Sequence, residues 1–294
     1  MELRLSSNDH PTRPEDRVPF LGKVIYGLGG FVNNLLAASI GGMVIVLNLG
    51  LGMNPALVGL LGAIPRLTDA ITDPLMGFIS DHTRSRWGRR RPYIFVGAIA
   101  AGIIFALLWQ LPEGRSELFY FLVFLGGSVI FFLSYTIFAT PWVALGYELT
   151  PDYNERTRVM GVQNFIAQFA YLLSPWFLWF MQRDSFDSLM DGAETLAILV
   201  GATVILLGIL PAIFLRERYQ EVAQKEVEQH GSLASSLREK IGENVKTFFA
   251  GFVTTLKFAP FLKLCLATFL VFNGFMLISS FQFYVIIYYV FGGD

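Results

Sequence analysis

Long apolar segments constrain the fold of this chain more than any other feature. Segments of about 20 or more predominantly apolar residues recur over residues 20–49, 56–80, 93–112, 118–148, 159–182, 194–215 and 261–290. A helix of that length crosses the hydrocarbon core of a bilayer. The apolar runs are continuous and lack the ~10-residue alternating segments of a transmembrane barrel. We therefore expect an all-α polytopic membrane protein with the lipid bilayer as its first partner.

Composition excludes several functional classes. Only 15% of the residues are charged, against about 25% in soluble domains, and the net charge of −1 gives no basic surface for nucleic acid. The three histidines lie in polar segments without a zinc-binding spacing. Phosphate-loop, dinucleotide-binding and Gly-x-Ser-x-Gly patterns are also absent from the sequence. The sequence thus predicts no enzyme and no cofactor.

The distribution of lysine and arginine predicts the orientation. With the N-terminus inside, 19 of the 22 Lys and Arg residues fall on the cytoplasmic side or at its interface, as the positive-inside rule requires. We expect a multi-pass protein of the inner or plasma membrane with a cytoplasmic N-terminus. The predicted divisions are a cytoplasmic tail (1–19), a six-helix bundle (20–215), a cytoplasmic middle linker with an amphipathic helix (216–260), and the first helix of an incomplete second bundle (261–294).

The second apolar segment carries an acidic stripe of Arg66, Asp69 and Asp73. A charge at bilayer depth costs at least ~2.5–3.5 kcal/mol, so such residues usually pair or bind an ion. At 100° per residue the three positions fall within about 60° on one helix face. Together with Thr72 and a hydroxyl from another helix, the carboxylates would bind Na⁺ or a proton. In the alternative, Arg66 neutralises Asp69 in a structural network, but one arginine cannot cancel two carboxylates.

An arginine-rich turn follows that segment, with five arginines between residues 84 and 91. Such a turn anchors the chain against anionic headgroups. Charge pairs with the next cytoplasmic loop would also hold the cytoplasmic side of a rocking transporter shut. The predicted cytoplasmic gate consists of Asp81, Arg84, Arg86, Arg89, Arg90, Glu148 and Arg156.

Neutral polar residues occur in three other apolar segments. They are Asn33 and Asn34, then Tyr135, Thr136 and Trp142, and then Gln163, Asn164 and Gln168. Each one alone is typical of hydrogen bonding between membrane helices. Together they suit a polyhydroxy solute, whose CH faces stack on aromatic rings while its hydroxyls form hydrogen bonds.

Four motifs carry a family resemblance. They are Tyr26-Gly27-x-Gly29, Asp69-Ala-Ile-Thr-Asp73-Pro-Leu-Met-Gly77, Thr83-Arg-Ser-Arg-Trp-Gly88 with Pro92, and Tyr135-Thr136-Ile137 with Pro141. With them the chain resembles the glycoside-pentoside-hexuronide:cation symporter family of the major facilitator superfamily, in its melibiose-permease-like branch. The resemblance implies a six-plus-six helix bundle in which an ion-coupled, sugar-type solute crosses between the halves.

The resemblance also assigns the site residues. It implies that the coupling cation is held by Asp69, Asp73, Thr72 and Thr136, with Arg66 as charge partner. The expected solute pocket comprises Tyr26, Asn33, Asn34, Tyr135, Trp142 and Asn164.

Departures from the family pattern concern the solute half of the site. The melibiose-permease-like branch has a Lys-Asp pair where this chain has Asn33-Asn34, and an aspartate, a tryptophan and an arginine where it has Ala139, Val143 and Asn164. The residues that bind the cation in this family are kept, whereas the charged residues that bind a galactoside are replaced. Melibiose itself is therefore not expected as the solute. A second half would need roughly 200 residues after the linker. We therefore expect an N-terminal half plus a seventh helix, apparently truncated, with missing C-terminal helices completing the pathway.

The sequence thus predicts a secondary transporter of a sugar or glycoside-type solute, coupled to Na⁺ or H⁺ and working by alternating access. One alternative keeps the fold but carries a lipid or other amphiphile, and predicts a lateral opening lined by phenylalanine. A second alternative is a non-transporting membrane sensor or partner subunit. It predicts either no central cavity at all, or Arg66 bridging both aspartates with no room for an ion.

Overall fold

The computed structural model describes residues 12–83, 85–112, 114–217, 257–284 and 289. Every regular element in that part of the chain is helical, which confirms the predicted all-α class. The amphipathic stretch expected within 216–260 falls almost wholly on residues outside the described part. The elements are η1 (Pro14–Asp16), α1 (Phe20–Leu49), α2 (Pro55–His82), α3 (Arg91–Leu108), α4 (Glu117–Glu148), α5 (Tyr153–Met181), α6 (Leu189–Gly208), α7 (Leu210–Phe214) and α10 (Ala259–Tyr284).

Side-chain caps determine where several helices begin. The Asn54 side chain accepts a hydrogen bond from the Ala56 amide at the start of α2, and Asp152 accepts one from the Glu155 amide at the start of α5. Such caps satisfy backbone N–H groups that have no partner within the helix. The apolar pattern placed the fifth segment at 159–182, whereas α5 begins at Tyr153. The difference arises because the first turns of α5 are polar and follow a capping aspartate.

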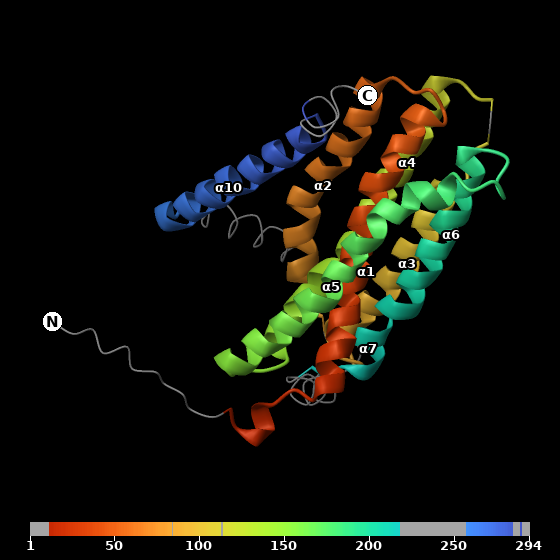
Figure 1. Ribbon diagram of the computed structural model, residues 1–294. Coiled ribbons are helices and arrows are strands. Elements are labelled where there is room, and N and C mark those ends of the chain that lie inside the picture. Colours follow the sequence, from red (N-terminus) through yellow and green to blue (C-terminus); the bar gives the residue numbers. More distant parts are fainter. Residues whose placement is uncertain (1–11, 84, 113, 218–256, 285–288, 290–294) are drawn as a thin grey trace, which may run out of the picture. The chain divides into compact units, whose positions relative to one another are not determined.

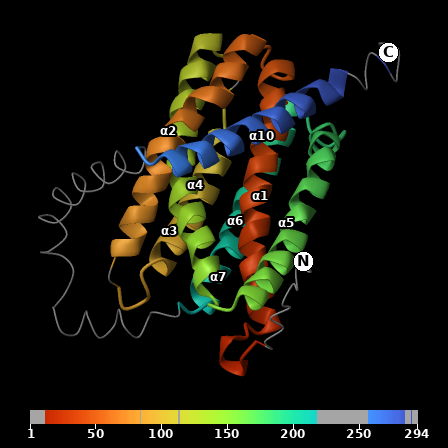
Figure 2. The same ribbon diagram turned by 90° about the vertical axis from the view of Figure 1, so that its left-hand side faces the viewer.

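The first six long helices form a chain of neighbours in the order α2, α4, α3, α6, α1 and α5. Figures 1 and 2 show these helices running alongside one another in one bundle. This order has an internal symmetry: if α1 is exchanged with α4, α2 with α5, and α3 with α6, the pair α2–α4 becomes α5–α1 and the pair α3–α4 becomes α6–α1. The pair α3–α6 is unchanged. That pattern is the mark of an internal three-plus-three repeat, which occurs in the halves of major facilitator transporters.

Glycines allow the closest helix crossings. A Cβ added at Gly97 of α3 would lie 2.7 Å from the carbonyl carbon of Ile137 in α4, and one added at Gly102 would lie 2.6 Å from the carbonyl oxygen of Gly201 in α6. Small residues let membrane helices approach until their backbones touch. These contacts bring the backbone of α3 directly against the backbones of α4 and α6.

Within the described residues, four stretches are long and apolar enough to cross a membrane: Pro14–Asn48, Arg91–Leu108, Glu117–Glu148 and Leu189–Phe214. Helices α2 and α5 are not among these four stretches. The apolar run of α2 is interrupted by the acidic stripe, and that of α5 by Gln163, Asn164 and Gln168. The chain divides into two compact units, residues 1–233 and 234–294. In the second unit, α10 begins with a shorter apolar stretch, Ala259–Val271.

Candidate cation and solute site

The acidic stripe lies where α2 packs against α4. The Thr136 hydroxyl of α4 donates a hydrogen bond of 2.7 Å to Oδ1 of Asp73. Close by on α2, Oδ1 of Asp69 and Oγ1 of Thr72 are buried, and neither has a hydrogen-bond partner in the described protein. Buried oxygens are rarely left without a partner, so each such atom calls for an explanation. A bound cation would supply one.

Arg66 does not neutralise the two aspartates directly. Its guanidinium lies over the Phe132 ring of α4, 5.2 Å from the ring centre. Among the ion pairs between described residues, none joins Arg66 to Asp69 or Asp73. The cation–π contact holds the positive charge beside the carboxylates while their oxygens stay available for another ligand.

Pro74 adds a further oxygen to this region. It lies inside α2 directly after Asp73 and has no N–H to donate to the carbonyl four residues earlier. The carbonyl oxygen of residue 70 therefore loses its helical partner between the two aspartates. Carboxylate, hydroxyl and carbonyl oxygens are the ligands that hard cations prefer.

A line of polar side chains runs from α4 through α1 to α5. The Tyr135 hydroxyl donates to Oδ1 of Asn33 at 2.7 Å. The Asn33 amide donates to Asn34 at 3.4 Å, and the Asn34 amide donates to the Ala167 carbonyl of α5 at 3.1 Å. Because Tyr135 and Thr136 are adjacent, α4 contributes both to this line and to the acidic stripe.

Tyr26 and Trp142, two expected pocket residues, are buried between α1 and α4. Their rings stack with centres 5.1 Å apart, and Trp142 Nε1 donates to the Tyr26 carbonyl at 3.2 Å. They are only 2% and 4% exposed, so in this conformation the structure places them in helix packing and not on a solute-accessible surface. A sequence motif does not show which helix face a residue occupies. Asn164, in contrast, is exposed on α5.

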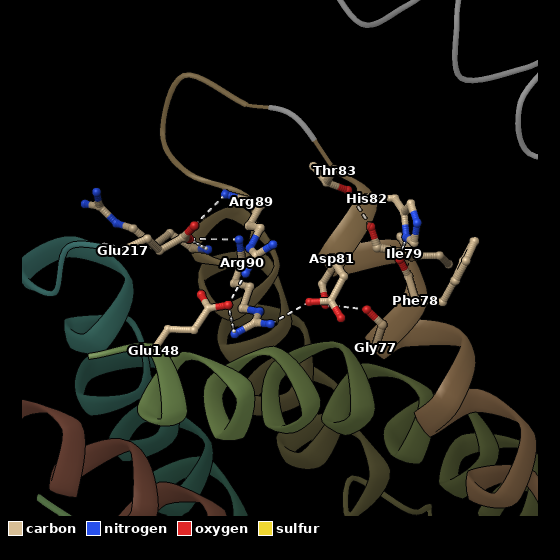
Figure 3. A network of polar contacts seen from close by, with 12 residues as sticks. Gly77, Phe78, Ile79, Asp81, His82, Thr83, Arg89, Arg90, Glu148 and Glu217 are labelled. Carbon is tan, nitrogen blue, oxygen red and sulfur yellow. Dashed lines mark hydrogen bonds and ion pairs between the residues drawn. The ribbon is translucent and has the colours of Figure 1, made fainter. Parts of the chain in front are cut away.

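Four predicted gate residues come together at one end of the bundle, where α2, α3 and α4 meet (Figure 3). Arg89 forms an ion pair with Glu148, and Arg90 pairs with Asp81 at 2.5 Å and with Glu148 at 3.1 Å. We call Asp81, Arg89, Arg90 and Glu148 the charge cluster. It ties the ends of three helices to one another.

Two of the other three predicted gate residues, Arg86 and Arg156, belong to the described part of the chain. Arg86 is exposed, and Arg156 donates to the Thr150 carbonyl in the α4–α5 loop at 3.1 Å. Arg84 is outside the described residues.

The first turn of α1 and the segment before it both contact the start of α5, which the sequence did not predict. Lys23 forms a 2.7 Å ion pair with the buried Glu155, and Oδ1 of Asp152 accepts a 3.0 Å hydrogen bond from Thr12. The Glu155 amide hydrogen bond, aided by Thr12, holds the pKa of the Asp152 carboxyl below its usual range. Sequence spacing gave no signal, because the partners lie about 130 to 140 residues apart.

Comparison with known proteins identifies the family. The sequence pattern of the family described as MFS/sugar transport protein matches residues 25–290. The chain belongs to this family. The predicted helical-bundle fold and the predicted family resemblance are thereby confirmed.

Individual relatives are symporters. The chain is 34% identical to an uncharacterised symporter of Synechocystis over 49% of this chain and 28% of that protein. It is 33% identical to a protein named as a glycoside/cation symporter in Escherichia coli, over 40% of this chain and 25% of that protein. It is also 28% identical to sodium-dependent lysophosphatidylcholine symporter 1-A of Danio rerio, over 46% of this chain and 25% of that protein. The matched stretch thus spans about a quarter of each relative's length.

Proposed function

We propose that the protein is a secondary transporter that couples the movement of a sugar or glycoside-type solute to Na⁺ or H⁺ by alternating access. The observation that carries this proposal is the group of buried oxygens on α2. Asp69 Oδ1 and Thr72 Oγ1 lack partners beside the Asp73–Thr136 hydrogen bond. Such a group in an apolar bundle suits a cation held by Asp69, Thr72, Asp73 and Thr136.

The solute would bind along the polar line of Asn33, Asn34 and Tyr135, with the exposed Asn164 at its α5 side. Amide and hydroxyl groups match the hydroxyls of a glycoside. The Escherichia coli relative is named for glycoside and cation together, which supports this solute class. Helices beyond those described here would supply the other half of the site.

Coupling would arise at α4, where Tyr135 faces the polar line and Thr136 faces the acidic stripe. A shift of this one helix turn on cation binding would alter the solute site as well. Coupling requires that each ligand bind more tightly when the other is present.

The charge cluster would close the cytoplasmic side of the pathway in one state. Its three ion pairs join α2, α3 and α4 at the end of the bundle that contains the arginine-rich turn. Under the positive-inside rule that end would face the cytoplasm, and the proposal puts the N-terminus inside the cell.

Gradient-driven uptake tests the proposal. The full-length protein in sealed vesicles should accumulate a glycoside when an inward Na⁺ or proton gradient is imposed, and Asp73→Asn should abolish the gradient dependence. Asp184→Asn, in the exposed α5–α6 loop, is the matched control and should leave uptake unchanged. Uptake that ignores both gradients and the Asp73 substitution would contradict cation coupling.

An amphiphilic solute is a second candidate. The Danio rerio relative is named for a lysophospholipid, and α5 presents the exposed rings of Phe165, Phe169 and Trp176. Sodium-dependent uptake of a lysophospholipid without uptake of any glycoside would favour it. A non-transporting role has less support, because Arg66 stacks on Phe132 and does not bridge the aspartates.

A further inference from the structure

Glu217 stands at the exit of the six-helix bundle, and its side chain is aimed at the start of α3. Glu217 is 4% exposed, and its carboxylate accepts hydrogen bonds from three successive backbone amides. Oε2 accepts from Arg89 at 2.9 Å, while Oε1 accepts from Arg90 at 2.9 Å and from Arg91 at 3.1 Å (Figure 3). The first amides of a helix have no partner within it, and a negative charge there is also favoured by the helix dipole.

Gly88 makes this approach possible. Its φ of +106° is a conformation that residues with a side chain rarely adopt, and a Cβ at this position would lie 2.6 Å from Oε1 of Glu217. The turn before α3 therefore has two independent reasons to require glycine. One is the backbone conformation, and the other is the space that the carboxylate of residue 217 occupies.

The contact is reciprocated by Arg91. Its Nε donates to the Ala212 carbonyl at 2.5 Å, and its Nη2 donates to the Ile213 carbonyl at 2.9 Å. These carbonyls belong to α7, near whose end the chain leads into Glu217. The start of α3 and the end of α7 thus cap each other through one buried carboxylate and one buried guanidinium.

The residues that Glu217 holds by their backbone also carry the charge cluster. Arg89 and Arg90 place their guanidinium groups on Glu148 and Asp81, and their amides are bound by Glu217. We propose that Glu217 is a positioning residue for the cytoplasmic gate, holding the α2–α3 turn so that Arg89 and Arg90 reach their partners. This inference rests on the proposed gating role of the charge cluster.

Two variants disturb the contact from opposite sides. Glu217→Ala removes the acceptor, and Gly88→Ala pushes a methyl group against it. In the full-length protein, hydrogen–deuterium exchange of residues 89–91 should become about tenfold faster or more, because a hydrogen bond to a charged group is lost. Glu15→Ala is the matched control, since Glu15 is exposed and its ion pair is with Arg13, before α1, and it should leave the exchange unchanged.

A labelling measurement separates a gating role from simple helix capping. Cys265 is the only cysteine, so a Cys265→Ser background with Val143→Cys, an exposed position on α4 five residues before Glu148 of the charge cluster, provides a single labelling site. A membrane-impermeant maleimide added from the cytoplasmic face should label this site about tenfold faster in both variants, because loosening the α2–α3 turn would also release the ion pairs of Arg89 and Arg90.

The outcomes divide cleanly. Faster exchange together with faster labelling supports the proposal. Faster exchange with unchanged labelling would show that Glu217 caps α3 without positioning the gate, and would contradict the proposal. Unchanged exchange would show that the Glu217 carboxylate does not bind the amides of residues 89–91. Neither measurement involves a solute, so a failure of the transport proposal would be seen separately, as uptake that ignores the ion gradients.

Discussion

At the scale of single residues, two adjacent side chains of α4 contact the two parts of the proposed site, one the solute-binding part and the other the cation-binding part. Tyr135 bonds to a neutral amide on α1, whereas Thr136 bonds to a carboxylate on α2. Each hydroxyl can be removed without touching the other's partner, so the proposed cation and solute roles make distinct predictions.

Thr136→Val should weaken cation binding selectively. The substitution keeps the volume of the side chain but removes the hydroxyl that donates to Asp73. A hydrogen bond to a charged group is worth about 1.5–3 kcal/mol, so the Na⁺ or proton concentration for half-maximal uptake should rise about tenfold or more. Ser134→Ala is the control, because Ser134 is also buried but bonds to the Ile130 carbonyl of its own helix. Equal shifts in both variants would contradict a role for Thr136 as a cation ligand.

Asp152→Asn should cost stability at neutral pH but not at low pH. The pKa of Asp152 is lowered in the folded state by the Glu155 amide and the Thr12 hydroxyl. A lowered pKa contributes stability above the unfolded value of about 3.9, and that stability is lost as the pH falls through the folded-state pKa. The difference in Tm between wild type and variant, measured in detergent, should therefore be largest near pH 7 and shrink below about pH 4. A difference that is independent of pH would contradict this account.

At the scale of helices, the close crossings depend on the absence of side chains at a few glycines. Gly97 of α3 faces the backbone of α4, while Gly126 on α4 faces open space. Both lie inside helices, where alanine is intrinsically the better residue. Packing against the neighbouring helix therefore decides whether a glycine-to-alanine substitution raises or lowers the stability of the bundle.

Gly97→Ala should destabilise the bundle, and Gly126→Ala should not. A methyl group at position 97 would lie 2.7 Å from the carbonyl carbon of Ile137, and such overpacking costs about 1–3 kcal/mol. Thermal unfolding of the two variants in the same detergent measures the difference. If the Gly97 variant is as stable as the Gly126 variant, α3 and α4 are not in backbone contact.

The helices themselves were well predicted from the sequence, and the long-range polar contacts were not. The first apolar segment, 20–49, coincides with α1 (Phe20–Leu49), because continuous apolarity in lipid leaves helix as the only satisfied backbone. The start of α5 was missed because its capping turn is polar. Glu217 was missed because the amides it caps lie 126 to 128 residues earlier in the chain, and spacing in a sequence does not report such pairs.

In the candidate site, too, the sequence predicted which residues share a helix face but not which side chains they contact. Helical periodicity put Arg66, Asp69 and Asp73 on one face of α2, but only the structure shows Arg66 over Phe132. A periodic pattern specifies a face and not a side-chain rotamer. For the same reason the motif around Tyr26 did not reveal that its ring is buried against Trp142.

At the scale of the whole molecule, the charge distribution predicts one orientation in the membrane. Single cysteines in a Cys265→Ser background test it, with Glu15→Cys before α1 and Asp187→Cys between α5 and α6, both exposed positions. In intact cells an impermeant maleimide should label position 187 readily and position 15 only after the membrane is permeabilised. The reverse pattern would contradict a cytoplasmic N-terminus.

The central claim is that the acidic stripe of α2 binds the coupling cation in concert with the solute. The most direct test is the Na⁺ or proton affinity of the purified full-length protein, measured by titration calorimetry with and without a glycoside that the protein transports. The account predicts that the glycoside raises the cation affinity by about 5- to 150-fold, and that Asp73→Asn abolishes cation binding. A cation affinity that is unchanged by the glycoside, or that survives Asp73→Asn, would contradict it.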